Sequence, residues 1–329
     1  MLANSIELMM KFADDTGLTS TNPPRRYLWT DSFGVCNFLG LYQMTGEKKF
    51  KDLALQLVDQ VHRTLGKHRE DDVRTGWLGS EDQPTKNGLR IGKTLPERKP
   101  HEPYDPILEW ERDGQYFHYL TKWMHALFRV HQVVKEEKYL TWATDLAQAS
   151  TRFIRDNRMF WKMNISLSNP LVPSMGQHDP IDGYVTFKVL QTVSEVGLEV
   201  ALKKLEKMVQ EGNLVTNDPL GIGGLLFDAY RLEQLGIDSK KKERIITAAL
   251  IGLEYTQLSH DLAFRELGLA IGLQAAKKMQ IAEEHWTLID EINNYWLQHS
   301  DWTEHTDINR VMLATSLLPN SFLSISDPL

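Results

Sequence analysis

Thiol groups are almost absent from this sequence, since Cys36 is its only cysteine. A single cysteine excludes an internal disulfide framework and any metal site built from several thiolates. Cys36 lies in the apolar run FGVCNFLGLY, so we expect it to be a small buried core residue. Strand signals are scarce too, because no alternating run of β-branched residues is flanked by Asn-Gly or Asp-Gly turns. These absences predict an all-α protein without disulfides.

Excess positive charge and long apolar runs are also lacking. The net charge is −7, and the short basic run SKKKER at 239–244 is typical of a solvated helix start, so we expect no nucleic-acid partner. No window reaches the roughly 18 apolar residues of a membrane span, and no basic region precedes an apolar run near Met1. The sequence thus predicts a cytoplasmic protein without a membrane partner. No ligand spacing indicates a bound metal, and we expect no cofactor.

Helical periodicity, in contrast, is abundant and comes in pairs. In each pair an almost wholly apolar helix is followed by a short turn and then by an amphipathic helix with one charged face. The last apolar helix, at 306–318, has no following partner, and the amphipathic helix at 3–13 has no preceding one, so these two complete a sixth pair. The other five pairs occupy residues 29–66, 113–154, 181–209, 219–256 and 260–298.

Repeated helical pairs bury their apolar faces on their neighbours. Helices that are apolar all round must be buried on every side, whereas amphipathic helices bury only their apolar face. Alternation of the two kinds along the chain is typical of a closed double ring of inner and outer helices. The sequence therefore predicts an (α/α)6 toroid, a six-hairpin barrel of alternating inner and outer helices that forms a single domain over residues 1–329. The long irregular segment at about 67–111 is expected to be a lid-like loop.

The stretch that begins at Tyr27, YLWTDSFGVCNFLGLYQMTGEKKFKDLALQLVDQV, resembles the first hairpin of the six-hairpin glycosidase superfamily. The nearest likeness is to the unsaturated-glycuronyl hydrolases, in which a W-x-D segment opens an inner helix and a T-G-(D/E)-x-x-(Y/F) turn leads to the outer one. N-acylglucosamine 2-epimerase-like proteins share the same hairpin style. The resemblance implies a carbohydrate-active enzyme. In the hydrolases a lone aspartate protonates the sugar double bond and activates water, and the resemblance assigns this work to Asp31.

Inner helices of a toroid run parallel, so their N-termini gather at one end, where free N–H groups and helix dipoles favour anions. Asp31 follows Thr30 at the first such start, Asp113 opens the second, and GQHDPIDGY places His178 at the third. We predict Asp31, Asp113 and His178 as catalytic residues. By the resemblance, Asp113 would be the partner of Asp31, and His178 would bind sugar hydroxyls or a substrate carboxylate.

A simpler interpretation applies to all such acids, because Asp is a preferred helix N-cap and a cap need not face a substrate. We favour this interpretation for Asp218 and Asp261. His118 and His125, deeper in the second inner helix, are expected to be hydrogen-bonded core residues. Arg90, with Lys93, is a candidate contact for a substrate carboxylate. Aromatic and polar residues near the helix starts and in the long loop are predicted to contact substrate. These are Tyr27, Trp29, Arg90, Gln115, Tyr116, Asp179, Asp182, Arg265 and His305.

Two carboxylates in an aromatic-lined pocket are typical of glycoside hydrolysis, in which one donates a proton and the other activates water or attacks the anomeric carbon. We predict a glycoside hydrolase that acts on an oligosaccharide, with uronate-containing ones as candidates. Two alternatives stay open: an epimerase or isomerase with paired histidines among His178, His260 and His305, and a toroid that only binds sugar or a partner protein. A small molecule or an oligosaccharide is the expected ligand, and the sequence leaves the oligomeric state open.

Overall fold

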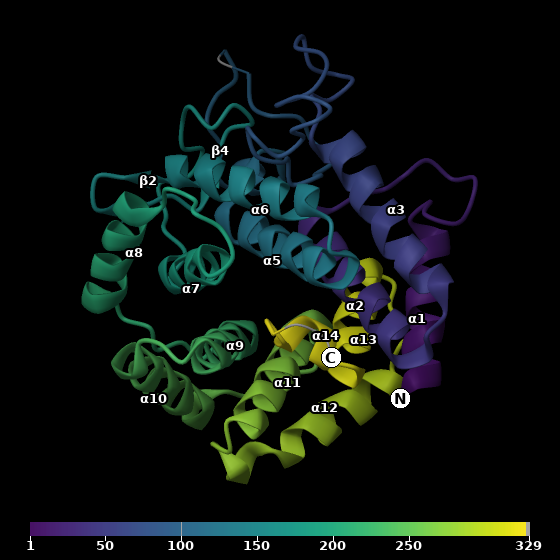
Figure 1. Cartoon of the computed structure of the whole chain (residues 1–329), viewed down its shortest axis with the longest axis vertical. Helices are drawn as coiled ribbons and strands as arrows, with labels where there is room; N and C mark the ends of the chain where they lie inside the picture. Colours follow the sequence, from purple (N-terminus) through teal and green to yellow (C-terminus); the bar gives the residue numbers. More distant parts are fainter. Residues whose placement is uncertain (100, 327–329) are drawn as a thin grey trace. The chain divides into compact units, whose positions relative to one another are not determined.

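The computed structural model describes residues 1–99 and 101–326, and Figure 1 labels its elements. Within these residues, none of the helices combines the length and the apolar character that a membrane crossing requires. The chain divides into two compact units, and each is described by itself below. The first unit comprises Met1–Asn22, Cys36–Asp52 and Gly212–Leu329, and the second comprises Pro23–Val35 and Leu53–Glu211.

Two helical hairpins belong wholly to the second unit. In each hairpin consecutive helices lie side by side, because α5 contacts α6 and α7 contacts α8 (Figure 1). Helix α5 also contacts α7, so successive hairpins pack on each other. Two-residue strands join the connecting segments: β1 pairs antiparallel with β4, and β2 with β3. The elements are α4 (Pro106–Glu111), β1 (Gln115–Tyr116), α5 (Phe117–Val134), α6 (Glu137–Ser150), η1 (Thr151–Phe153), β2 (Ile154–Arg155), β3 (Arg158–Met159), β4 (Lys162–Met163), α7 (Asp179–Gln191) and α8 (Glu199–Glu211).

The first unit repeats the arrangement. Helix α9 contacts α10 and α11, and α11 contacts α12 and α13. Helix α1 contacts α13, which confirms that the amphipathic N-terminal helix pairs with the last apolar one. The elements are α1 (Leu2–Asp15), α9 (Pro219–Leu235), α10 (Ser239–Tyr255), α11 (Ala263–Lys278), η2 (Glu283–His285), α12 (Thr287–Gln298), α13 (Thr306–Leu317) and α14 (Asn320–Leu323), and α2 (Leu28–Thr45) and α3 (Lys48–Leu65) contribute residues to both units.

Burial follows the predicted alternation of helix types. In α7 every residue from Asp179 to Phe187 is buried, so this helix is covered all round. In α8 only one stripe is buried, and its members are spaced as one face of a helix requires. The stripe consists of Ala201, Leu202, Leu205, Met208 and Val209. Cys36 is buried as predicted.

Helix α9 begins with the capping interaction that the simpler interpretation predicted. The carboxylate of Asp218 accepts a hydrogen bond of 3.0 Å from the backbone N–H of Gly221. Asp261 is different: it is exposed, and α11 begins two residues later without a side-chain cap. The cap interpretation is therefore confirmed for Asp218 and wrong for Asp261.

The prediction that Asp113 opens the second inner helix is wrong, since α5 begins at Phe117. The residues between them enter strand β1, where Gln115 pairs with Met163 and Tyr116 with Lys162. Their backbone groups are used in this ladder and are unavailable to a helix. The partner strand lies more than forty residues further along the chain, so helical periodicity around Asp113 could not reveal it.

The segment between α3 and α4, described for residues 66–99 and 101–105, is irregular but tied to its unit by a buried amide. Oε1 of Gln115 accepts a hydrogen bond from the backbone N–H of Leu89 (2.9 Å), and its Nε2 donates to the carbonyl oxygens of Asn87 and Ile165. Gly88 adopts a positive φ of 84° here, and a Cβ at this position would lie 1.9 Å from Oε1 of Gln115. The amide and the glycine together fasten the loop.

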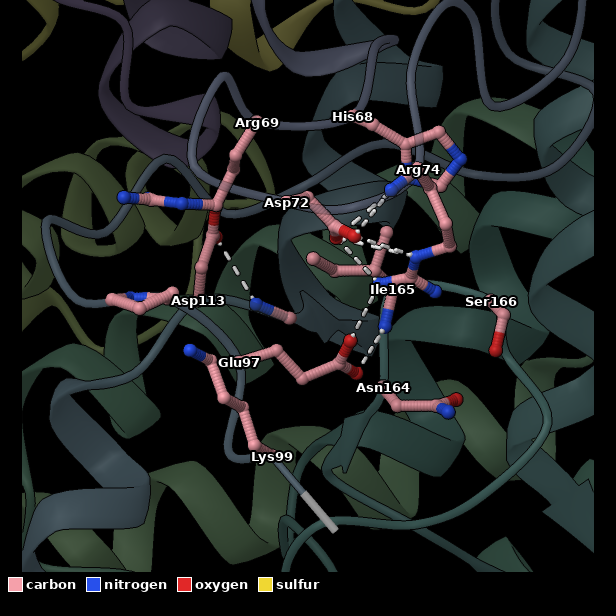
Figure 2. Close-up of polar contacts among 12 residues, drawn as sticks. His68, Arg69, Asp72, Arg74, Glu97, Lys99, Asp113, Asn164, Ile165 and Ser166 are labelled. Carbon is pink, nitrogen blue, oxygen red and sulfur yellow. Dashed lines mark hydrogen bonds and ion pairs between the residues drawn. The ribbon is translucent and has the colours of Figure 1, made fainter. Parts of the chain in front are cut away.

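Ion pairs fasten the same segment near its middle (Figure 2). The guanidinium of Arg74 donates to Asp72 (2.7 Å) and to one oxygen of Glu97 (3.0 Å). The other Glu97 oxygen accepts a hydrogen bond of 2.9 Å from the backbone N–H of Ile165. Hydrogen bonds from Arg74 lower the pKa of Asp72 to about 2, so this pair stays charged over the physiological range. The lid role of the loop stays a prediction.

Glycines allow α9 and α11 to meet at backbone distance. A Cβ added to Gly223 of α9 would lie 2.0 Å from the carbonyl oxygen of Gly268 in α11. One added to Gly272 of α11 would lie 2.4 Å from the Cα atom of Gly223. No side chain fits between the two helices at this point, so their separation is set by these three residues.

We expect Gly223→Ala to lower the free energy of unfolding by about 1–3 kcal/mol, because overpacking a close contact costs that much. The loss should appear even though alanine has the higher helix propensity. Urea unfolding followed by circular dichroism measures it. Gly197→Ala is the matched control, since only Oε2 of Glu199, at 3.9 Å, lies within 4 Å of a Cβ there. Equal midpoints for the two variants would contradict the close contact.

Candidate active site

Aromatic rings gather around the starts of α2 and α5 in the second unit. The Tyr119 ring lies in the middle, with centroid distances of 5.4 Å to Tyr27, 5.0 Å to Tyr116 and 4.7 Å to His118. The hydroxyl groups of Tyr27 and Tyr119 share a hydrogen bond of 2.7 Å. We call this group the aromatic cluster; its members are Tyr27, Trp29, Trp110, Tyr116, His118, Tyr119 and Trp161.

The aromatic cluster reaches the surface of its unit. Trp29 and Tyr116 are buried, and the other five rings are partly exposed. Trp110 and Trp161 meet edge to face at 5.1 Å, and Trp110 lies 6.2 Å from Tyr116. Burial raises the pKa of Tyr119 well above its ordinary value, so its hydroxyl keeps its proton. The cluster thus combines partly exposed aromatic rings with phenolic hydroxyl groups.

A carboxyl group borders the aromatic cluster. Asp179 is the first residue of α7, and its Oδ1 lies 3.7 Å from Nδ1 of His118. Its Oδ2 is buried and has no hydrogen-bond partner among residues 1–99 and 101–326. Gly176 leaves room for the carboxyl group, because a Cβ at this position would lie 2.6 Å from Cγ of Asp179. The backbone turn before α7 therefore holds the acid close to the cluster.

Burial raises the pKa of Asp179 to about 7. The nearby carboxylate of Asp182 acts in the same direction, whereas His178 and Lys122 act against it. Without a cation in direct contact, the charged form is poorly solvated, so the neutral acid is favoured. Near neutral pH this group is divided between its two forms, which is the property of a group that both donates and accepts protons.

His118 is held in one neutral form. The indole N–H of Trp161 donates a hydrogen bond of 3.0 Å to its Nδ1, so the ring proton is on Nε2. Burial, together with the charge of Lys122, lowers the pKa of His118 to about 3. The prediction that His118 is a core residue is wrong in one respect: its side chain is hydrogen-bonded but 25% exposed, whereas His125 is buried as predicted.

Asp182 and His178 flank the acid from the same turn. Asp182 is fully buried, and its two oxygens accept hydrogen bonds from Thr121 and from the ammonium group of Lys122, the latter at 2.9 Å. This pairing makes Asp182 a fixed negative charge three residues after Asp179. His178 occupies the N-cap position of α7 without a side-chain capping bond.

Asp31, the first predicted catalytic acid, is already paired. It lies in the first turn of α2 with 1% of its surface exposed. One oxygen is 3.3 Å from the guanidinium of Arg26, and the other accepts a hydrogen bond of 2.9 Å from the backbone N–H of Tyr27. This geometry fixes the chain that carries Tyr27 and Trp29 into the aromatic cluster. A carboxylate held in this way suits positioning better than proton donation.

Asp113, the second predicted catalytic acid, is saturated with donors in the loop. Its Oδ2 accepts a hydrogen bond of 2.6 Å from Arg90 and is 3.6 Å from Arg69. Its Oδ1 accepts hydrogen bonds from the backbone N–H groups of Gly92 and Gly114. The other donors of Arg90 bind the carbonyl oxygens of Lys67 and Thr64. Asp113 and Arg90 thus form a buried ion pair, and the Gln115 amide is likewise hydrogen-bonded within the protein, while their roles towards a substrate stay predictions.

The remaining predicted residues lie in the first unit. Arg265 pairs with the cap residue Asp218. His305 has a positive φ of 54° before α13, and its ring lies 5.6 Å from that of Phe264. His260 is hydrogen-bonded to Glu266 through both its backbone N–H and its ring. Within the described residues, no group of three or more His, Cys, Asp and Glu side chains could hold a metal ion.

Comparison with known proteins identifies the fold. No protein-family model matches the chain, and no curated protein matches its sequence. Solved structures do match. One is an inactive variant of an α-1,6-mannanase of Salegentibacter, with two consecutive aspartates replaced, in complex with α-1,6-mannotriose. Its TM-score is 0.62 at 11% identity, and the match covers 98% of this chain and 99% of that chain. The chain has the (α/α)6 toroid fold. It is shared by the six-hairpin glycosidase-like proteins, as the sequence predicted.

Two further structures show the range of proteins with this fold. Cellobiose 2-epimerase from Bacillus thermoamylovorans has a TM-score of 0.60 at 10% identity, with 96% of this chain and 98% of that chain covered. A possible member of the GH105 family from Klebsiella pneumoniae has a TM-score of 0.59 at 12% identity, with 98% and 92% covered. At these identities the likeness establishes the fold, and the chemistry has to be argued from the site.

The burial of Asp179 makes a prediction about stability. Its pKa of about 7 in the folded protein lies above the ordinary 3.8, so the native state holds the proton more tightly than the unfolded state does. The charged form therefore destabilises the fold above pH 7, and this cost fades as the pH falls towards 4. We expect Asp179→Asn to be more stable than wild type at pH 8, with an advantage that shrinks by on the order of 2 kcal/mol at pH 5.

Thermal or urea unfolding of both proteins at several pH values measures this difference. Asp261→Asn, at an exposed position before α11, is the control and should show no such trend. A pH-independent difference for Asp179→Asn would contradict the raised pKa.

Proposed function

We propose that the protein is a glycoside hydrolase-like enzyme in which Asp179 is the general acid. The observation that carries this proposal is a buried carboxyl group with a pKa of about 7 beside a partly exposed aromatic cluster. Aromatic rings pack on the apolar face of a sugar ring, and an acid that is half protonated near neutral pH can transfer its proton to a leaving oxygen. The substrate class is an oligosaccharide, with uronate-containing ones included.

The residues around Asp179 suggest the order of events. A sugar ring lies on the rings of the aromatic cluster, and the Nε2–H of His118 donates a hydrogen bond to one of its oxygens. Asp179 gives its proton to the glycosidic oxygen, which leaves as an alcohol when the anomeric C–O bond breaks. Water adds to the anomeric carbon, and the carboxylate of Asp179 takes the proton that this water loses. On an unsaturated uronate the same proton would go to a carbon of the double bond, and water would add to the other carbon. The pairing of Asp182 with Lys122 leaves Asp179 as the acid whose charge state can change.

Proteins with the same fold support this proposal. The solved structures with this fold include mannanases, a possible GH105 member and sugar epimerases or isomerases. The net charge of −7 fits a carbohydrate ligand better than a nucleic acid. A cytoplasmic location, a single barrel domain and a lid formed by the loop before α4 belong to the same proposal.

A sugar isomerase or epimerase is the second candidate, because an imidazole lies beside the acid. Such an enzyme needs a base that removes a proton from carbon 2 of the sugar. His118 is poorly suited, since its pKa is about 3 and its Nδ1 already accepts a hydrogen bond from Trp161. Incubation with aldoses in deuterium oxide distinguishes the two: exchange at carbon 2 that survives Asp179→Asn supports the second candidate.

We expect Asp179→Asn to lower kcat for oligosaccharide hydrolysis by roughly 10²- to 10⁴-fold, because a general acid contributes about that much. In the wild type, activity should fall as the pH rises through about 7, where Asp179 loses its proton. Both kcat and its pH dependence are measured over a panel of neutral and uronate-bearing oligosaccharides. The signal is the release of reducing sugar or, for an unsaturated uronate, the absorbance of its double bond.

Asp261→Asn is again the matched control and should keep the wild-type rate and pH profile. Asp31→Asn is informative as well, since its pairing with Arg26 makes it a positioning residue. It should weaken substrate binding without moving the pH profile. Hydrolysis at the wild-type rate by Asp179→Asn would overturn the proposal.

A further inference from the structure

A second pocket, separate from the aromatic cluster, lies in the second unit between α3, α6 and the loop before α4. Its volume is about 150 Å³, and none of its lining residues belongs to the aromatic cluster. Trp77, Tyr139 and Trp142 supply aromatic walls, and Leu55 and Val58 of α3 add an aliphatic side. The indole N–H of Trp142 donates a hydrogen bond of 2.9 Å to the carbonyl oxygen of Asp82, which fixes this ring in place.

A buried imidazole lines this pocket. His62 is 3% exposed, and its Nε2 accepts a hydrogen bond of 3.1 Å from the indole N–H of Trp123. Burial lowers the pKa of His62 to about 3, so the ring is neutral and its proton is on Nδ1. The bond from Trp123 occupies Nε2 alone, so the Nδ1–H can donate to an oxygen of a ligand in the pocket.

The charges at the mouth of the pocket are balanced. Arg63 pairs with Asp59 at 2.9 Å, and Lys138 pairs with Glu136 at 2.7 Å. The charged lining residues are two bases, Arg63 and Lys138, and two acids, Asp59 and Glu81. Neither sign of charge predominates among these residues, and hydroxyl groups can hydrogen-bond to both. The pocket therefore favours a neutral polar ligand.

The size of the pocket selects a single ring. An apolar cavity of about 150 Å³ is known to accept benzene, so the space suits one six-membered ring and not a chain of them. Aromatic walls suit the C–H face of a saturated ring, while the His62 donor and the charged mouth suit its oxygens. We propose that this pocket is a second sugar-binding site, which takes one neutral pyranose residue. The inference stands independently of the catalytic role of Asp179.

Ligand-observed saturation-transfer NMR with methyl α-D-mannopyranoside and methyl β-D-glucopyranoside tests this site. We expect binding of at least one glycoside in the millimolar range, and at least tenfold weaker binding to Trp142→Ala. Trp286→Ala is the matched control, because Trp286 also donates to a backbone carbonyl, that of Ile281, and lies under a lysine, Lys277. Trp142→Ala should leave the turnover of an oligosaccharide unchanged.

Two further measurements keep this test separate from that of the proposed function. Asp179→Asn should bind the glycoside as the wild type does; loss of binding in this variant would place the probe at the aromatic cluster and overturn the inference. Trp77→Ala serves if Trp142→Ala fails to fold by circular dichroism. Binding of neither glycoside, or tighter binding of glucuronate than of the neutral glycosides, would also overturn it.

Discussion

Helices that are buried on every side constrain where this protein can place polar groups. A helix such as α7, whose residues are buried without interruption from Asp179 to Phe187, cannot carry an unpaired charge in its middle without a large desolvation cost. A buried charge inside a helix therefore needs a partner, as Asp228 has in Arg231 within α9. Helix starts offer free backbone N–H groups in addition, and the candidate acid lies at such a start.

Partnership with cations then separates the acids into two kinds. Asp31 and Asp113 each have a buried arginine, and Asp182 has Lys122. Such pairs stabilise a particular arrangement of the chain, because removing either partner leaves a buried charge. Among residues 1–99 and 101–326, no arginine or lysine forms an ion pair with Asp179, and burial favours its protonated form instead. The difference in partners, not the presence of a carboxylate, is what marks this position for chemistry.

The helical hairpins could be read from the sequence because their signal is local. Periodicity over a dozen residues distinguishes a helix like α7 from one like α8, and the surplus helix at each end of the chain predicted the contact of α1 with α13. The site was harder to predict, since its partners come from distant segments. Asp113 meets Arg90 across a loop, and Trp161, which sets the tautomer of His118, follows it by 43 residues in a stretch without periodicity.

The fastening of Gly88 against Gln115 has a consequence for how this chain can be altered. Gly88 and Gln115 must be exchanged together. A variant that keeps Gln115 but has any residue other than glycine at position 88 would place a side chain against the Gln115 amide. A variant that keeps Gly88 but lacks Gln115 would leave the backbone N–H of Leu89 without this acceptor. Substitutions at positions 88 and 115 should therefore be coupled in natural or engineered variants.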